Sequence, residues 1–479
     1  MRKIINRLDL ATIFCLLALH FSNCTKLVSI SPPVNTISTS QVFSTDREAT
    51  EAMAGIYFAM INNGTPQVFN GAMTIYGGAA ADEFLFFDQT NTNNVQFQKN
   101  QIAPNSGIVA SNFWQTMYST IYGCNSVISG AEASTTIHDS VRNELIGEAE
   151  FVRAFANFYL VNLFGGVPWV TTIDYNKTSL LTNSSPDTIY SAILADLLDA
   201  QNRLPTDYSV GLGQRIIPNR WAATALLARV YLYRGDWNDA AIQASNIIGN
   251  SGLYNLVRPL NNVFLINSNE AIWQLQQNIQ GYPYNATPEG NLIIPYNPTS
   301  QPLLYLTPML LNAFESQDNR RSVWVDSTIY SGMTYYYPQK YQIGSGQSSS
   351  TASYSEYYMV LRLSEQYLIR AEAEAHGASG GVSSAIKDLD SIRGRAGLPF
   401  YIGSSDLDSV LQAIGHERQI ELFGEWGHRW LDLKRWGTAP SLLSGEKGYT
   451  VTTNVLLFPI PFGELQADPN LKQNPGYNE

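Results

Sequence analysis

Three carboxylates near the C-terminus have the spacing that acid–base chemistry would need. Glu417, Glu421 and Glu425 follow one another at intervals of four residues, which places them on one face of a helix. Two carboxyl groups about 5–10 Å apart are what glycoside hydrolysis requires. Arg418 and Arg429 stand three and four residues from Glu421 and Glu425, so ion pairs within the helix explain the pattern equally well. We therefore assign no catalytic residue.

Metal and phosphate chemistry find little support in the sequence. The five histidines are scattered, and no Cys/His spacing is typical of zinc. The acidic residues Asp82, Glu83 and Asp88 lack the glycine-containing loop of an EF-hand. The glycine-rich run at residues 343–350 has no lysine and no following helix, unlike a phosphate-binding loop. No metal and no cofactor are predicted.

Aromatic rings mixed with amides and carboxylates favour the binding of a neutral polar ligand. Sugars stack their apolar C–H faces on rings and need Asn, Gln, Asp or Arg beside them, and peptides use similar surfaces. Residues 82–94 and 280–305 have this mixture, with further rings at Tyr335, Tyr336 and Tyr337. The alternative for each residue is packing within a loop. The candidate ligand-binding residues are Asp82, Phe86, Phe87, Asp88, Asn91, Tyr282, Tyr284 and Tyr296.

The charge balance excludes some classes of partner. The 479-residue chain has 29 basic and 40 acidic side chains, a net charge of −11, which argues against binding nucleic acid or an anionic membrane surface. Charged residues make up 14% of the chain and aromatic residues 12%. A neutral surface rich in aromatic side chains suits a sugar or a peptide.

The N-terminus reads as an export signal. Residues 1–23 have a basic start and a short apolar core that is too short to span a bilayer. Cys24 follows at once and resembles the acylated cysteine of a bacterial lipobox, although Asn23 stands where that motif has a small residue. The alternative is an ordinary cleaved signal. With Cys15 in the leader and Cys24 acylated, Cys124 would have no partner for an intrachain disulfide.

The chain that must position these residues is mostly helical in pattern. Residues 220–249 match the tetratricopeptide pattern of two antiparallel helices, and residues 358–399 form a related pair. Residues 71–106 and 261–354 are rich in Gly, Asn, Ser, Tyr and Pro and read as irregular. Residues 455–477 read as an extended, proline-punctuated tail. Apolar periodicity predicts further helices at residues 47–61, 113–132, 147–165, 184–205 and 411–437.

Five blocks in this order resemble the SusD/RagB family of nutrient-uptake outer-membrane lipoproteins of Bacteroidetes-type bacteria. Together they extend over essentially the whole mature chain. The blocks are residues 147–171, 226–241, 361–375 with 392–399, 417–437, and 457–465 with 473–477.

The resemblance implies a mainly α fold: a tetratricopeptide-like scaffold of about four helix pairs, with a loop-rich, irregular ligand-binding portion and short strands. We interpret the charged residues inside the blocks as structural, forming ion pairs and hydrogen bonds to helix ends; they are Arg153, Glu372, Arg393, Arg395, Arg429, Asp432 and Arg435. The expected organisation is a signal peptide (1–23), a lipid anchor and tether (24–45), an N-terminal helical region (46–260) and a C-terminal region with the loop-rich insertion (261–479).

The resemblance also implies a function. A family member captures a nutrient ligand without catalysis and delivers it, as a lid, to a SusC-like TonB-dependent transporter in the outer membrane. The expected ligand is an oligosaccharide, and the expected location is the cell surface, held there by the lipid on Cys24. Three alternatives stay open: capture of a peptide, as in RagB-like members; a glycoside hydrolase; and a lid that holds no ligand itself.

Overall fold

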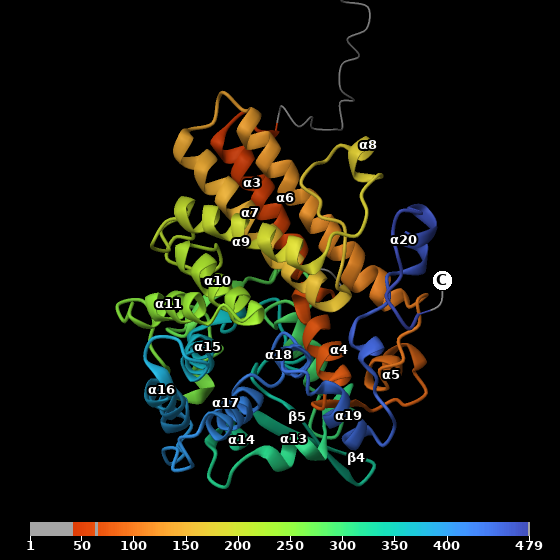
Figure 1. Cartoon of the computed structure of the whole chain (residues 1–479), viewed down its shortest axis with the longest axis vertical. Coiled ribbons are helices and arrows are strands. Elements are labelled where there is room, and N and C mark those ends of the chain that lie inside the picture. The colour runs from red at the N-terminus through yellow and green to blue at the C-terminus, as the bar shows by residue number, and fades with distance from the viewer. Residues whose placement is uncertain (1–41, 63–65, 478–479) are drawn as a thin grey trace, which may run out of the picture.

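The computed structural model describes residues 42–62 and 66–477, and it is mainly helical, as predicted (Figure 1). The predicted signal peptide, Cys24 and most of the tether lie outside the described residues. Within those ranges, no helix combines the length and the apolar character needed to cross a bilayer.

Four long helices form the upper part of the molecule in Figure 1. The structure confirms the predicted α9, whose N-cap Ser185 accepts a hydrogen bond from the backbone N–H of Thr188, with Pro186 in the first turn. The third predicted helix begins at Asp139, not near residue 147. The four are α3 (Asp46–Ile61), α6 (Thr116–Ala133), α7 (Asp139–Phe164) and α9 (Pro186–Arg203), with α6 preceded by the short π-helix η2 (Ile108–Gln115).

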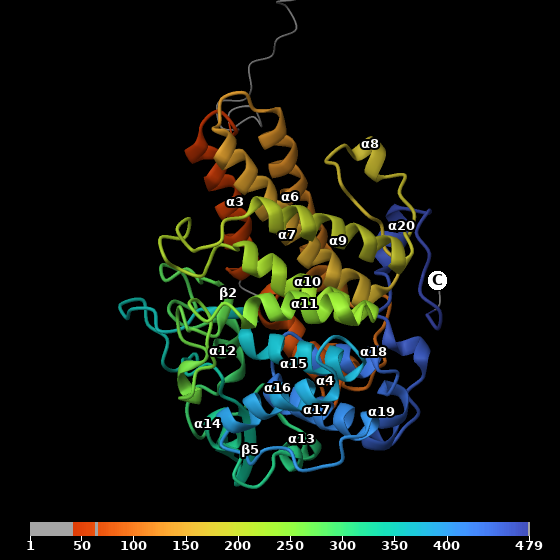
Figure 2. The ribbon, with the colours of Figure 1, turned by 60° about the vertical axis from the view of Figure 1, so that its left-hand side comes forward.

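Two helix pairs that are far apart in sequence stack on each other. Helix α11 packs against α15, so the interrupted repeats are neighbours in space (Figure 2). Alanines fill the crossing, which lets the helix backbones approach closely; they are Ala228, Ala240, Ala244 and Ala373. The helices are α10 (Arg220–Arg234), α11 (Trp237–Ile248), α15 (Leu363–Ala375), α16 (Gly381–Arg395) and α17 (Leu407–Glu421).

The prediction of one helix over residues 411–437 is wrong. Helix α17 ends at Glu421, and α18 (His428–Arg435) begins after a break. Gly424, Trp426 and Gly427 have φ angles of +63°, +48° and +65° in this break, a left-handed conformation that cannot continue a right-handed helix.

The prediction of a loop over residues 71–106 is wrong. This segment contains α4 (Met73–Ala80), β1 (Phe84–Phe86) and α5 (Thr92–Gln98). Every residue of α4 is buried. The glycines that suggested a loop permit close packing instead: a Cβ on Gly78 would lie 2.5 Å from the ring of Phe84. A short π-helix, η1 (Val68–Ala72), leads into α4.

The predicted loop-rich insertion with short strands is confirmed. The strands of the described residues form three two-stranded antiparallel sheets, in which β1 pairs with β3, β2 with β6, and β4 with β5, so the insertion pairs with strands on both sides of it in the sequence. The strands are β2 (Ala271–Leu275), β3 (Leu304–Leu306), β4 (Val325–Tyr330), β5 (Met333–Pro338) and β6 (Tyr358–Arg362). The short helices are η3 (Leu260–Asn262), α12 (Pro288–Ile293), α13 (Pro308–Ala313) and α14 (Asn319–Val323).

The C-terminal tail runs back along the helical part of the molecule, largely extended as predicted. The backbone N–H of Phe458 donates to the carbonyl of Leu163 (2.7 Å), and Asn474 Nδ2 donates to the carbonyl of Phe164 (2.9 Å). The remaining short helices are α8 (Tyr175–Thr178), α19 (Ala439–Lys447), η4 (Thr453–Leu456) and α20 (Phe462–Ala467).

A buried network of charges joins the insertion to the repeats. Glu421 accepts hydrogen bonds from Arg320 (3.0 Å), from Arg362 (2.6 Å) and from Arg395. Burial alone would raise the pKa of Glu421, but the guanidinium groups of Arg395, Arg362 and Arg320 hold it well below its ordinary value. Glu425 is bound by Arg362 and Lys340. The carboxylate of Glu421 is fully buried and is bound by three guanidinium groups, so its role is structural.

The predicted partners of these carboxylates within one helix are wrong. Arg418 pairs with Asp432 (2.8 Å) and Arg429 pairs with Asp82 (2.8 Å). The break after α17 takes Glu425 and Arg429 out of the helix that carries Glu421. The prediction of structural ion pairs for the charged family residues is confirmed, with the additional pairs Arg153–Asp196, Arg393–Glu315, Arg395–Glu270 and Arg435–Glu372.

Replacement of Glu421 should test the importance of this network. The Glu421→Gln variant keeps the shape of the side chain but leaves three buried guanidinium groups short of one negative charge. We expect the free energy of unfolding to fall by about 3–5 kcal/mol, as measured by urea denaturation followed by circular dichroism. Glu51→Gln, which removes an exposed pair with Arg47, should leave stability unchanged. Equal stability of both variants would contradict a structural role for Glu421.

Candidate functional site

The fold brings the two predicted binding stretches together. In the β1–β3 sheet, Leu85 lies opposite Tyr305 and Phe86 opposite Leu304. Strand β3 in turn packs against β5 of the β4–β5 hairpin. The end of each predicted stretch and the predicted helper ring of Tyr335 therefore meet at one place.

Four half-buried rings gather there, which we call the hairpin cluster: Phe87, Tyr305, Tyr330 and Tyr335. The ring of Phe87 lies 5.5 Å from that of Tyr330 and 5.2 Å from that of Tyr335, and Tyr305 lies 5.2 Å from Tyr335. All three contacts are edge to face, an arrangement that holds rings in fixed orientation. Partial burial raises the pKa of Tyr305, so its hydroxyl stays protonated and able to donate.

Polar side chains border the hairpin cluster on the chain that leaves β1. Asp88 is exposed and accepts hydrogen bonds from the hydroxyl (2.6 Å) and the backbone N–H (2.9 Å) of Thr90, which lower its pKa. Asn91 is exposed and caps α5 by accepting from the N–H of Asn94 (3.3 Å). A carboxylate and an amide held in this way beside rings can hydrogen-bond sugar hydroxyl groups.

A second pair of rings stands on the loop after β2. Tyr282 is 63% exposed, and its ring meets that of Tyr284 edge to face at 5.9 Å. The start of the loop is fixed by Tyr354, whose hydroxyl donates to the carbonyl of Gln277 (2.6 Å) and accepts from the N–H of Ile279 (2.9 Å). The rings therefore project from a loop that is anchored at its base.

Tyr296 is 64% exposed and stands on the segment between α12 and β3. Gly346 sits so close to its backbone that a Cβ there would lie 1.9 Å from the Tyr296 carbonyl oxygen. The same loop of residues 343–351 reaches the tyrosine pair, because Ser349 N–H donates to Asn285 (2.7 Å). On the other side, Ile329 of β4 donates its N–H to Pro298 (2.9 Å).

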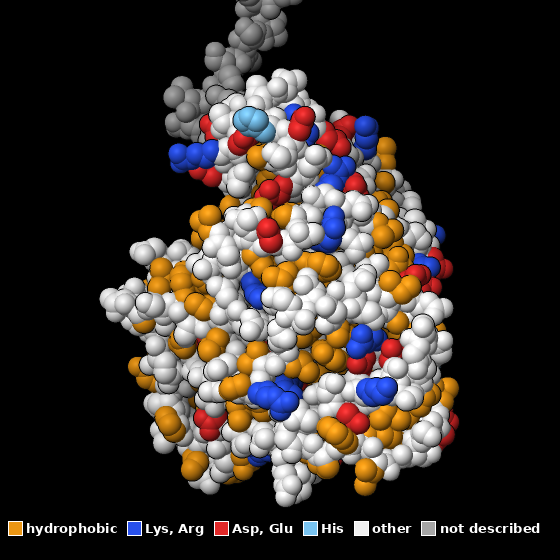
Figure 3. Space-filling view, turned by 90° about the vertical axis from the view of Figure 1, so that its left-hand side faces the viewer, with side chains coloured by type: hydrophobic (Ala, Val, Ile, Leu, Met, Phe, Trp, Pro, Cys, Tyr) orange, Lys and Arg blue, Asp and Glu red, His pale blue; other side chains and the backbone are white. Residues whose placement is uncertain are grey.

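These contacts link the segments that carry the rings, and we refer to Tyr282, Tyr284, Tyr296 and the hairpin cluster together as the loop face. The green and cyan loops that contribute to it project at the left of Figure 2. Figure 3 shows uncharged and hydrophobic side chains over much of this side of the molecule, with charged ones scattered among them. Such a surface suits a neutral ligand with apolar faces and hydroxyl groups.

The prediction that Asp82 and Phe86 contact the ligand is wrong. Both are buried, at 3% and 2% exposure. Asp82 accepts two hydrogen bonds of 2.8 Å from Arg429, and Phe86 packs against Tyr76 at 6.0 Å. Side chains alternate along β1, so Phe86 points inward and Phe87 toward the hairpin cluster. The interior also raises the pKa of Glu83 to about 8, chiefly through burial.

Tyr330 was missed by sequence reasoning, and Tyr305 was noted only as the end of a stretch. The signal that could have found Tyr330 is the Ser331-Gly332 pair between two runs rich in β-branched and aromatic residues, which predicts a hairpin over residues 325–338. Within the described ranges, no three His, Cys, Asp or Glu side chains are grouped so that they could hold a metal ion.

Comparisons with known proteins agree with this architecture. The model of the SusD family matches residues 325–477, and a related model, described as starch-binding and associating with the outer membrane, matches residues 43–232. The chain belongs to the SusD family. SusD-like protein P2 of Formosa agariphila is 28% identical over 97% of this chain and 99% of its own length. SusD-like protein P25 of the same organism is 23% identical over 92% and 94%.

Solved structures of the family have the same fold. A SusD superfamily protein of Bacteroides vulgatus superposes with a TM-score of 0.79 at 21% identity, over 90% of this chain and 99% of that one. A laminarin-binding SusD-like protein gives 0.72 at 24% identity, over 90% and 99%. Surface glycan-binding protein A of Bacteroides thetaiotaomicron, solved in complex with laminarihexaose, gives 0.74 at 21% identity, over 90% and 99%.

Two acidic residues of the first stretch, the buried Asp82 and the exposed Asp88, should behave differently when neutralised. Asp82→Asn leaves the buried guanidinium of Arg429 without its counter-charge, so we expect the free energy of unfolding to fall by about 3–5 kcal/mol. Asp88→Asn at the exposed position should leave thermal stability unchanged. Differential scanning calorimetry of both variants checks this, and a stable Asp82→Asn variant would show that the residue is free for another role.

Proposed function

We propose that this protein is a non-catalytic, lipid-anchored outer-membrane protein that captures an oligosaccharide and delivers it to a SusC-like TonB-dependent transporter. The observation that carries the proposal is the loop face, where exposed and half-buried rings stand near the polar side chains of Asp88 and Asn91. The names of relatives that bind laminarin or laminarihexaose support a glycan as the ligand class.

The charges of the molecule favour a neutral ligand at this surface. Residues 1–23 hold three basic side chains and one acidic one, so the mature chain would carry −13, against −11 for the whole chain. An anionic ligand would be repelled at long range, whereas a neutral glycan is not. Rings spaced along a face accept successive sugar units by stacking, and Asp88 and Asn91 can bind their hydroxyl groups.

Removal of the exposed rings tests the proposed site. We expect Tyr282→Ala, Tyr284→Ala and Tyr296→Ala together to weaken laminarihexaose binding at the loop face at least tenfold, because the stacking surfaces are lost. Isothermal titration calorimetry measures the affinity, and the helical circular-dichroism signal should stay intact because these rings lie on loops.

The matched control is Tyr175→Ala, which removes a tyrosine that is 77% exposed on α8. It should bind laminarihexaose as the unaltered protein does. Unchanged binding by the triple variant would overturn the site. A panel of glycans and peptides that yields binding only to peptides would overturn the glycan and favour the RagB-like alternative. Release of shorter sugars from a bound glycan would overturn the non-catalytic role.

Anchoring through Cys24 would fit the position of Phe43, which lies near the start of the described residues. Phe43 packs against Gly130, and its carbonyl accepts from the hydroxyl of Ser134 (2.7 Å), so the tether enters beside the end of α6. That end of the molecule is opposite the β4–β5 hairpin (Figure 1). A lipid on Cys24 would therefore leave the hairpin cluster directed away from the anchor.

Replacement of the anchoring cysteine tests this arrangement. Cys24→Ser should move the protein from the membrane fraction to the soluble fraction, because no acyl chains are added. Cys124→Ser is the control, since Cys124 is buried and should leave membrane attachment unchanged. Protease treatment of intact cells then reports the side of the membrane: digestion supports surface exposure, and full protection would place the protein in the periplasm. Copurification with a TonB-dependent transporter tests the partner.

A further inference from the structure

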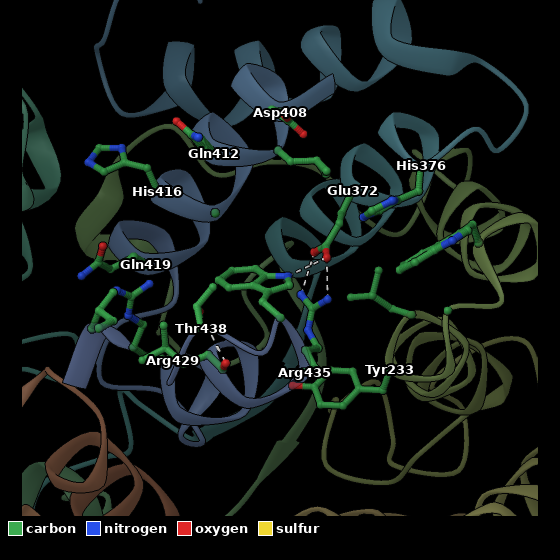
Figure 4. A pocket seen from close by; sticks show the side chains of 18 of the residues that line it. Tyr233, Glu372, His376, Asp408, Gln412, His416, Gln419, Arg429, Arg435 and Thr438 are labelled. Atoms are coloured by element: carbon green, nitrogen blue, oxygen red, sulfur yellow. Dashed lines mark hydrogen bonds and ion pairs between the residues drawn. The ribbon is translucent and has the colours of Figure 1, made fainter. Parts of the chain in front are cut away.

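A groove of about 960 Å³ lies between helices, apart from the loop face. The turn from α10 to α11 forms one side, α17 another, and α18 with the start of α19 the floor. None of the tyrosines of the loop face lines it. Its size is in the range of pockets that bind small ligands. Figure 4 shows Tyr233 and His376 at one end, and His416 and Gln419 at the other.

The groove offers aromatic ring surfaces and does not require a charged ligand. Trp237 and His376 stack at 4.1 Å and nearly parallel. Arg435 lies over the rings of Tyr233 (5.3 Å) and Trp436 (4.8 Å). Arg435 is neutralised by two hydrogen bonds to Glu372 (Figure 4).

The other arginines of the groove also have acidic partners. Arg429 is bound by Asp82, and Arg234 by Asp236. Because these cations are already paired, an anionic ligand would gain little here. The rings and the remaining polar groups favour a neutral ligand.

Two buried polar groups of the groove have no partner among the described residues. Gln419 is 8% exposed, and its Nε2 makes no hydrogen bond. The hydroxyl of Tyr233 is buried and equally unbonded. Burial raises the pKa of Tyr233 well above its ordinary value, so this hydroxyl keeps its proton and can donate. Buried polar atoms without a partner also occur away from the groove, as at Gln366, but the side chains of Gln419 and Tyr233 are among those that line the groove.

We propose that this groove is a second binding site for a neutral sugar, in which Gln419 and Tyr233 donate hydrogen bonds to hydroxyl oxygens and the rings of Trp237, His376 and Trp436 contact C–H faces. The ligand class rests on the proposed function, while the site rests on the groove itself. A buried donor that gains a partner recovers much of what its desolvation cost, so ligand binding is favoured by the groups that the fold leaves unbonded.

The test is the stoichiometry of laminarihexaose binding, with removal of the two donors. Tyr233→Phe with Gln419→Met keeps the size of both side chains and removes only groups that have no partner, so the fold should be as stable as before. We expect calorimetry to give two sites for the unaltered chain and one for this double variant. Hydrogen exchange of residues 231–237 and 408–419 should slow on adding the sugar, and only when both donors are present.

A matched control removes one tyrosine hydroxyl and one unpartnered buried glutamine elsewhere. Tyr118→Phe with Gln366→Met, neither of which lines the groove, should keep two sites. One site in the unaltered chain, or two in the donor variant, would overturn the groove site. Protection of the groove by peptides and not by sugars would also overturn it.

The loop face is tested separately from the groove. Its triple tyrosine variant should lose one binding site, and the slowing of hydrogen exchange in the groove on adding the sugar should be unchanged. If that variant keeps both sites, the loop face is wrong and the groove stands. Loss of both sites in the triple variant, with the groove unprotected, would overturn the groove and leave the loop face standing. Absence of binding to any glycan overturns both.

Discussion

The carboxylate of Glu421 is the point on which the arrangement of the chain depends. It lies at the end of α17 and binds Arg320 of α14, Arg362 of β6 and Arg395 of α16. These arginine side chains are at most 2% exposed. Their burial is costly unless each finds a counter-charge. The loop-rich insertion therefore has one position on the helical repeats in which its cations are compensated, and this specifies the join more narrowly than apolar packing alone.

The same network determines how firmly the loop face is held. Strand β6, which carries Arg362, pairs with β2, and the tyrosine loop leaves β2 at its last residue. Tyr358 of β6 donates to Glu289 of α12 (2.9 Å), so the helix beyond that loop is tied to the same strand. The exposed rings thus stand on loops whose two ends are fixed, while their tips face solvent. Rings positioned in this way lose less conformational entropy when a ligand binds.

The sequence predicted helices well where apolar periodicity and caps coincide, as at Ser185 and Pro186 before α9. It failed where a tertiary contact decided the outcome. The glycines at 77 and 78 allow α4 to pack closely, yet in the sequence they are typical of a loop. The left-handed residues Gly424, Trp426 and Gly427 divide a segment whose apolar pattern continues through the break. In the candidate site, Phe87, Tyr282, Tyr284 and Tyr296 are exposed or half-buried and stay predictions of ligand contact, whereas Asp82 and Phe86 are excluded, because one long-range ion pair and the alternation of a three-residue strand bury them.

The buried polar groups of the groove differ in their hydrogen bonding from the carboxylates at the centre of the molecule. In the centre, the carboxylates of Glu421 and Glu425 are surrounded by arginine and lysine donors. In the groove, the neutral donors of Gln419 and Tyr233 have no acceptor from the described chain. Each unpartnered buried donor costs about 1–3 kcal/mol, and an apolar residue of similar size would avoid that cost. A ligand that supplies two acceptors turns the same cost into affinity, which gives a physical reason for polar residues at these two positions.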